Sequence, residues 1–207
     1  MTRILRTAVF VLALTAWLWV WLPERGGFGP CLQRAPFEAS GRLAAEQALA
    51  CLKPGGQILV LRRDTSAFSN PATDAQMAAF RDTIRRARAC IQLERVLPVD
   101  PLRPVAVPSS EFCDLLKNSQ PDAVIVSFMG PPILTDADLI RLGEAKRLVI
   151  AFCPGPPPNA GDLKWLFDQG LLEKAIVMRP AGALSSRAAS VVIDVHNLTS
   201  WQGGNPL

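Results

Sequence analysis

Short apolar runs alternate with segments of helical spacing along most of the chain. The run 57–62 (QILVLR) has a continuous apolar core, which is typical of a strand covered on both faces of a sheet. Four further runs follow, at 91–98, 123–128, 148–152 and 175–179. This alternation predicts an α/β domain with a doubly wound, parallel, five-stranded sheet. Because crossovers between parallel strands are right-handed, the simplest strand order is 2-1-3-4-5, as in flavodoxin-like domains.

The segments around these runs carry helix signals. Apolar residues recur at helical spacing over 37–52. We expect a helix capped by Thr73, with Gln76 three positions on completing a capping box, and another helix capped by Thr135. Two more helices are predicted at 110–118 and 162–172.

An uncharged apolar segment, 8–22, stands near the N-terminus behind Arg3 and Arg6. It predicts a transmembrane signal anchor that contacts the bilayer through residues 4–22. A cleaved signal peptide is the alternative. The anchor is favoured because tryptophans suit a membrane interface and no small-x-small cleavage site follows. The preceding arginines place the N-terminus in the cytoplasm and the rest of the chain in a periplasmic or extracellular space. The interfacial tryptophans are Trp17, Trp19 and Trp21.

The pattern divides the chain into four parts. These are the anchor (1–23), a linker with a juxtamembrane helix (24–55), the extracytoplasmic α/β domain (56–182) and an extended tail (183–207). The tail contains one more β-like run, which forms either an edge strand or an arm that reaches a partner. The tail residues expected to contact a protein partner in a membrane assembly are Val191, Ile193 and Trp201.

Charge and cysteine content narrow the picture further. The formal net charge is +4, and Arg3 and Arg6 supply half of it. No basic stripe is present, so a nucleic-acid partner is not expected. The five cysteines show no CxxC and no metal-ligand spacing, and no metal site is predicted. Only Cys31 and Cys51 are considered as a disulfide pair, and the other three are expected to be small buried apolar residues.

In an open parallel sheet, ligands bind beyond the carboxyl ends of the strands, where the strand order reverses. Under the predicted order this crevice lies between strands one and three, and it could hold a polar or anionic small molecule. Alternatively, Arg63 and Asp64 pair with each other or cap helices. The candidate ligand-binding residues are Arg63, Asp64, Thr65, Ser66, Ser127, Gly130 and Asn159.

Catalytic signals are sparse. The single histidine, His196, lies in the tail, so a Ser-His-Asp centre would have to recruit it from there. No glycine-rich phosphate loop follows the first strand, and Asp64 has no second carboxylate two residues on that could help to hold a metal. We therefore expect neither an enzyme nor a cofactor.

The strand–helix order over 57–179 resembles one lobe of the type 1 periplasmic sugar-binding proteins, which are built from two doubly wound lobes around a cleft. Three functions follow from the whole pattern. The first is a membrane-anchored, non-catalytic accessory or interaction subunit of a larger assembly. The second, which the resemblance implies, is a small-ligand-binding module. The third is a hydrolase that uses Asp64 or Ser66.

Overall fold

The computed structural model describes residues 34–66, 70–98, 107–143, 147–153, 160–179 and 189–194, all within one compact unit, 33–207. Within these ranges, no helix is both long and apolar enough to cross a bilayer. The predicted anchor, 4–22, lies outside the described residues. The elements in chain order are α2 (Arg34–Cys51), β1 (Ile58–Arg63), α3 (Pro71–Arg86), β2 (Ile91–Leu97), α4 (Ser109–Asn118), β3 (Val124–Ser127), α5 (Asp136–Leu142), β4 (Leu148–Cys153), α6 (Ala160–Asp168), β5 (Lys174–Arg179) and β6 (Ala189–Ile193).

The strands form one sheet in the order β2-β1-β3-β4-β5-β6. Strands β1 to β5 are parallel, whereas β6 runs antiparallel to β5. The prediction of a five-stranded, fully parallel sheet in the order 2-1-3-4-5 is therefore corrected to a mixed, six-stranded sheet. The added strand comes from the tail, where it takes the edge-strand alternative and covers the free edge of β5.

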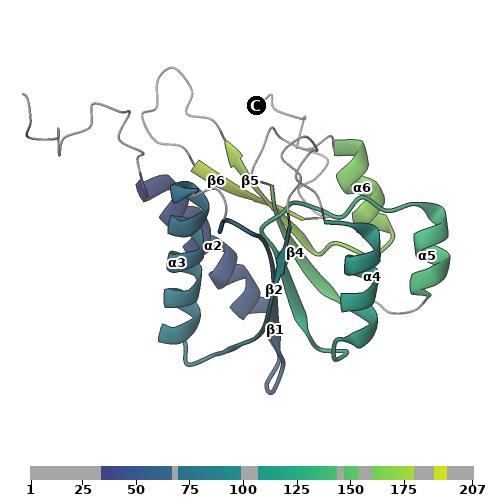
Figure 1. Ribbon diagram of the computed structural model, residues 1–207, viewed down its shortest axis with the longest axis horizontal. Coiled ribbons are helices and arrows are strands. Elements are labelled where there is room, and N and C mark those ends of the chain that lie inside the picture. Colours follow the sequence, from purple (N-terminus) through teal and green to yellow (C-terminus); the bar gives the residue numbers. More distant parts are fainter. Residues whose placement is uncertain are drawn as a thin grey trace, which may run out of the picture. The chain divides into compact units, whose positions relative to one another are not determined.

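Helices cover both faces of the sheet (Figure 1). The side chains of Ile58 and Val60 lie in one apolar cluster with α2 and α3, whereas Leu59 and Leu61 lie in a second cluster with α4, α5 and α6. This division follows from the strand geometry, because successive side chains point to opposite faces. The central strands are thus buried between two helical layers, whereas the edge strand β2 is largely exposed.

Helix α2, which lies in the segment 24–55 named above as linker and juxtamembrane helix, packs against α3 and the sheet. Its small residues allow close contact: a Cβ added at Gly41 would lie 2.1 Å from the carbonyl oxygen of Gln76. The Gln76 side chain is buried and donates from Nε2 to Ser40 Oγ at 3.2 Å. Gln76 is therefore part of the helix–helix contact.

The helix caps agree with the sequence prediction at one helix and differ at another. Helix α5 has the predicted cap, Thr135, which also forms a capping box with Asp138. Helix α3 begins earlier than predicted, because Asn70 caps it and accepts from the Thr73 amide, with Pro71 in the first turn. The prediction of Thr73 as the cap is thus wrong.

Candidate functional site

The carboxyl ends of β1 and β3 meet at the point where the strand order reverses, as predicted from the sequence. Backbone hydrogen bonds tie both departing loops to the sheet. The Asp64 amide donates to the Leu97 carbonyl at 2.8 Å, and the Phe128 amide donates to the Leu61 carbonyl at 2.8 Å. The first residues of these loops therefore occupy defined positions beyond the strand ends.

The loop after β3 is closed on itself. The Ser127 hydroxyl is fully buried and donates to the Gly130 carbonyl at 2.7 Å, while accepting from the Met129 amide at 3.3 Å. Gly130 has a φ of +89°, a left-handed conformation that favours glycine. The Ser127 hydroxyl is thus occupied within the loop rather than offered to a ligand.

The loop after β1 presents its polar groups differently. The Asp64 side chain is exposed, and its Oδ1 accepts from the Ser66 amide at 2.8 Å. These hydrogen bonds from Ser66 hold the pKa of Asp64 below its ordinary value. Arg63 donates from Nη2 to Thr73 Oγ1 at 3.0 Å. Thr65 is half-buried in the same loop, and Asn159 lies outside the described residues.

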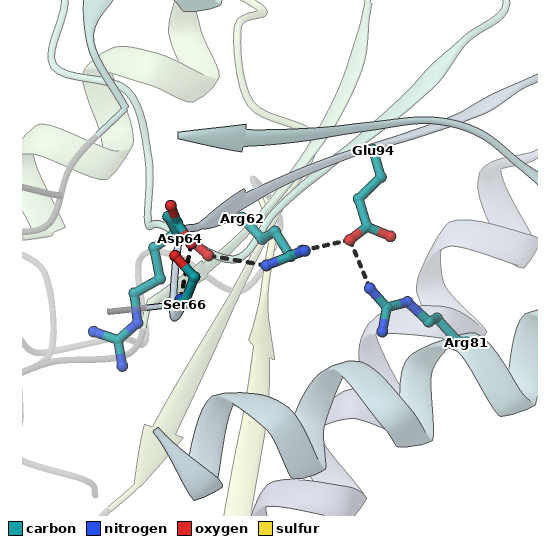
Figure 2. A network of polar contacts seen from close by, with 6 residues as sticks. Arg62, Asp64, Ser66, Arg81 and Glu94 are labelled. Atoms are coloured by element: carbon teal, nitrogen blue, oxygen red, sulfur yellow. Dashed lines mark hydrogen bonds and ion pairs between the residues drawn. The ribbon is translucent and has the colours of Figure 1, made fainter. Parts of the chain in front are cut away.

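Beside this loop, a carboxylate bridges two arginines, as Figure 2 shows. Glu94 on β2 pairs with Arg62 of β1 and, at 2.6 Å, with Arg81 of α3. Partial burial acts to raise the pKa of Glu94, but the hydrogen bonds from Arg62 and Arg81 outweigh it, so the pKa is lowered. Arg62 also donates from Nη1 to the Arg63 carbonyl at 3.2 Å. The network ties β1, β2 and α3 together directly before the Asp64 loop.

A cavity of about 460 Å³ opens on the other side of the β3 loop, between that loop and α6. Trp165 is the aromatic residue of its lining, and Asp162 supplies a carboxylate. A parallel bridge between Val107 and Pro132 holds the loop wall in place. The volume lies within the range of about 300–1,000 Å³ that small-molecule sites occupy. Its full lining is Pro131, Pro132, Ile133, Leu134, Asp162, Leu163, Trp165 and Leu166.

The crevice predicted from the sequence included Gly130, the neighbour of the lining residue Pro131, but did not include α6 as a wall. The available signal was Trp165 within the helix that follows β4, since that helix starts from the same edge of the sheet as the β3 loop. The Trp165 side chain is partly buried and packs against the core cluster beneath α6.

The outcome differs for each of the three tail residues proposed for partner contact. Ile193 is only 1% exposed and packs in the core with β5, so its assignment to a partner surface is wrong. Val191 pairs with Val177 across the antiparallel edge of the sheet. Trp201 lies outside the described residues.

The geometry of the described residues does not support cysteine or metal chemistry. Burial raises the pKa of Cys153 at the end of β4 to about 12, so this thiol stays protonated at neutral pH. Cys113 is buried as predicted, whereas Cys90 is exposed, which corrects its expected burial. Among the residues that the structure describes, no three His, Cys, Asp or Glu side chains come together as a metal site.

Comparison with known proteins relates the domain to binding proteins by fold. No protein-family model matches the chain, and no curated protein matches it. A carbohydrate transporter solute-binding protein from Agrobacterium radiobacter, in complex with D-arabinose, is similar at a TM-score of 0.53 and 11% identity, over 79% of this chain and 60% of that one. A sugar ABC transport substrate-binding protein from Bordetella parapertussis has a TM-score of 0.51 at 10% identity, over 83% and 61%.

The Caulobacter myo-inositol binding protein, bound to myo-inositol, has a TM-score of 0.50 at 16% identity, over 80% of this chain and 60% of that one. The chain thus spans about 60% of the length of these structures. The resemblance to one lobe of the type 1 periplasmic binding proteins is confirmed, and it concerns the fold.

Proposed function

We propose that this protein is a membrane-tethered, non-catalytic binding domain for a small carbohydrate or polyol, taken up in the cavity between the β3 loop and α6. The observation that carries the proposal is this cavity at the carboxyl edge of a sheet whose fold is shared with sugar-binding proteins. Ligands of open α/β sheets bind beyond this edge, and the cavity lies at this edge beside the β1–β3 reversal of the strand order. The ligand class comes from the neighbours, two of which hold D-arabinose and myo-inositol.

The lining suits a molecule with both apolar and hydroxyl faces. The ring of Trp165 and the prolines at 131 and 132 offer an apolar wall for the C–H face of a sugar ring. The Asp162 carboxylate is exposed and can accept hydrogen bonds from ligand hydroxyl groups. A few polar groups in a mostly apolar pocket are the usual composition of such sites. Arg63, Asp64, Thr65 and Ser66 remain proposed contacts for a ligand that extends toward β1.

The other two functions have less support. The accessory-subunit interpretation rested partly on Ile193, which is buried in the sheet. The hydrolase interpretation needs a proton donor or a metal beside Asp64. The lowered pKa of Asp64 keeps it ionised near neutral pH, which disfavours it as a general acid. The similar proteins are named as ligand-binding proteins.

Isothermal titration calorimetry of the full chain in mild detergent tests the binding proposal. We expect at least one ligand among D-arabinose, D-ribose, D-glucose and myo-inositol to bind. The substitution Asp162→Asn is expected to weaken that binding about 10- to 100-fold, because one carboxylate oxygen becomes an NH2 group that cannot accept and the remaining acceptor is uncharged. The control is Ile140→Ala on α5, at an 84% exposed residue outside the cavity lining, which should leave affinity unchanged. Absence of binding across the panel, or equal affinity of D162N, would contradict this site.

The tether is tested separately by alkaline carbonate extraction of membranes from expressing cells. A chain anchored through residues 4–22 stays in the pellet. Release into the supernatant, or a mature N-terminus beyond Pro23, would favour the cleaved signal peptide.

A further inference from the structure

A second concave surface lies on the opposite helical layer, between α2 and α3. It is a groove of about 800 Å³, and Figure 1 shows the two helices side by side on one face of the sheet. Nothing in the proposed ligand site uses this groove. Its cationic residues are Arg34, Arg42, Arg81, Arg85 and Arg86.

The groove carries an excess of positive charge. Its five arginines stand against three acidic residues, Glu38, Asp74 and Asp82, which leaves +2. The whole chain has +4, and Arg3 and Arg6 account for two of these charges. The residues after the anchor therefore carry a net charge of +2, which equals the net charge of the groove.

Several guanidinium groups of the groove keep donors to spare. Arg85 and Arg86 share the single carboxylate of Asp82 and are 80% and 75% exposed. Arg34 and Arg42 are exposed and form no ion pair with a described residue. A guanidinium has five N–H donors and binds phosphate oxygens in a bidentate fork, so each of these residues can take a phosphate group.

The floor between the arginines is made of small residues, Ala75, Ala78 and Ala79. Alanine methyl groups leave room above the helix for a headgroup to reach the guanidinium groups on either side. The groove is therefore both positively charged and open to a lipid headgroup.

The position of the groove in the chain points to the partner. Arg34, at the start of α2, stands only 12 positions after Leu22, the end of the predicted anchor. An extended segment of that length spans at most about 40 Å. A tether this short keeps α2 close to the bilayer surface and raises the effective concentration of headgroups there.

We propose that the α2–α3 groove docks on the membrane surface by binding the phosphate groups of anionic lipids through its arginines. The inference rests on the proposed tether, which supplies the nearby bilayer. Docking on this layer places α2 and α3 against the headgroups and orients the domain on the membrane.

The test uses the full chain in lipid nanodiscs of phosphatidylcholine alone or with one half phosphatidylglycerol. Each arginine is modified with phenylglyoxal, and mass spectrometry gives its rate. We expect Arg34, Arg42, Arg85 and Arg86 to react about fivefold more slowly in the anionic discs. Arg141 of α5 is the matched control for Arg85, because it is also exposed and paired with one aspartate, Asp114, but lies on the other layer. Its rate should not change.

Two variants sharpen the result. R34Q/R42Q should abolish the lipid-dependent protection of Arg85 and Arg86, whereas K117Q/R141Q, which removes the same charge from the other layer, should retain it. Equal rates in both kinds of disc, or protection of Arg141 as well, would overturn the proposal. Equal protection by free glycerol phosphate in neutral discs would also overturn it, in favour of a soluble-anion site. If alkaline carbonate extracts the chain from membranes, both the tether and the docking are wrong. Sugar binding is tested independently, by calorimetry alone.

Discussion

Replacing Ser127 by alanine removes one hydroxyl that serves two buried partners. The hydroxyl donates to the Gly130 carbonyl at 2.7 Å and accepts from the Met129 amide at 3.3 Å, and its own exposed fraction is 0%. A buried polar group that loses its partner costs about 1–3 kcal/mol. With two such groups, Ser127→Ala should lower the free energy of unfolding by about 2–4 kcal/mol. For a domain of this size, that corresponds to a fall in Tm of about 5–15 °C.

Urea unfolding followed by circular dichroism measures the effect. The matched control is Ser66→Ala, the same change at an exposed loop residue, for which we expect less than about 0.5 kcal/mol. Because Pro131 lies next to Gly130 and lines the cavity, S127A should also weaken sugar binding by displacing the loop. An S127A protein as stable as S66A would refute the internal role of this hydroxyl and return Ser127 to the ligand-binding candidates.

Three further substitutions test the framework. Glu94→Gln should cost about 1 kcal/mol at neutral pH. Because the folded pKa of Glu94 is lowered, its contribution is complete above the unfolded value of about 4.3 and is lost as pH falls through the folded pKa. In E94Q, the free energy of unfolding should therefore fall less steeply as the pH is lowered below about 4.3. The same pH dependence as in the unmodified protein would contradict a stabilising role for the Glu94 ion pairs. Gly41→Ala places a Cβ 2.1 Å from the Gln76 carbonyl oxygen and should cost about 3 kcal/mol in urea unfolding, whereas an unchanged midpoint would refute the close contact. Asn70→Ala removes the α3 cap and should cost about 1 kcal/mol by the same assay, and no loss would leave Thr73 as the cap.

The central strands β1, β3 and β4 were readable from the sequence because each has an apolar run that is buried on both faces. The edge strand β2 is largely exposed and was found from its alternation with the helices. The predicted ranges agree within one residue at each end, from 57–62 for Ile58–Arg63 to 175–179 for Lys174–Arg179. Strand β6 was ambiguous because an apolar run in a polar tail fits an edge strand or a free arm equally well. Only the pairing of β6 with β5 resolves this.

The candidate site was less predictable because it depends on contacts between distant segments. The reversal of strand order located the carboxyl edge. It did not predict which side chains at that edge are exposed: the Ser127 hydroxyl is buried within its own loop, whereas the Asp64 side chain is exposed. The pairing of Arg62 with Glu94 joins residues 32 positions apart on neighbouring strands. Trp165 lines the cavity because α6 packs beside the β3 loop; the sequence shows Trp165 within that helix but not the contact of the helix with the loop.

The two proposed surfaces occupy different layers of the domain. The cavity is lined from α6, which packs with the cluster around Leu59 and Leu61, whereas the arginine groove lies on α2 and α3, over the cluster around Ile58 and Val60. A domain docked on lipid through α2 and α3 therefore keeps the α6 layer on the far side of the sheet from the headgroups. Ligand capture and membrane docking are thus compatible in one molecule, and because they share no residue, each can fail its own test without affecting the other.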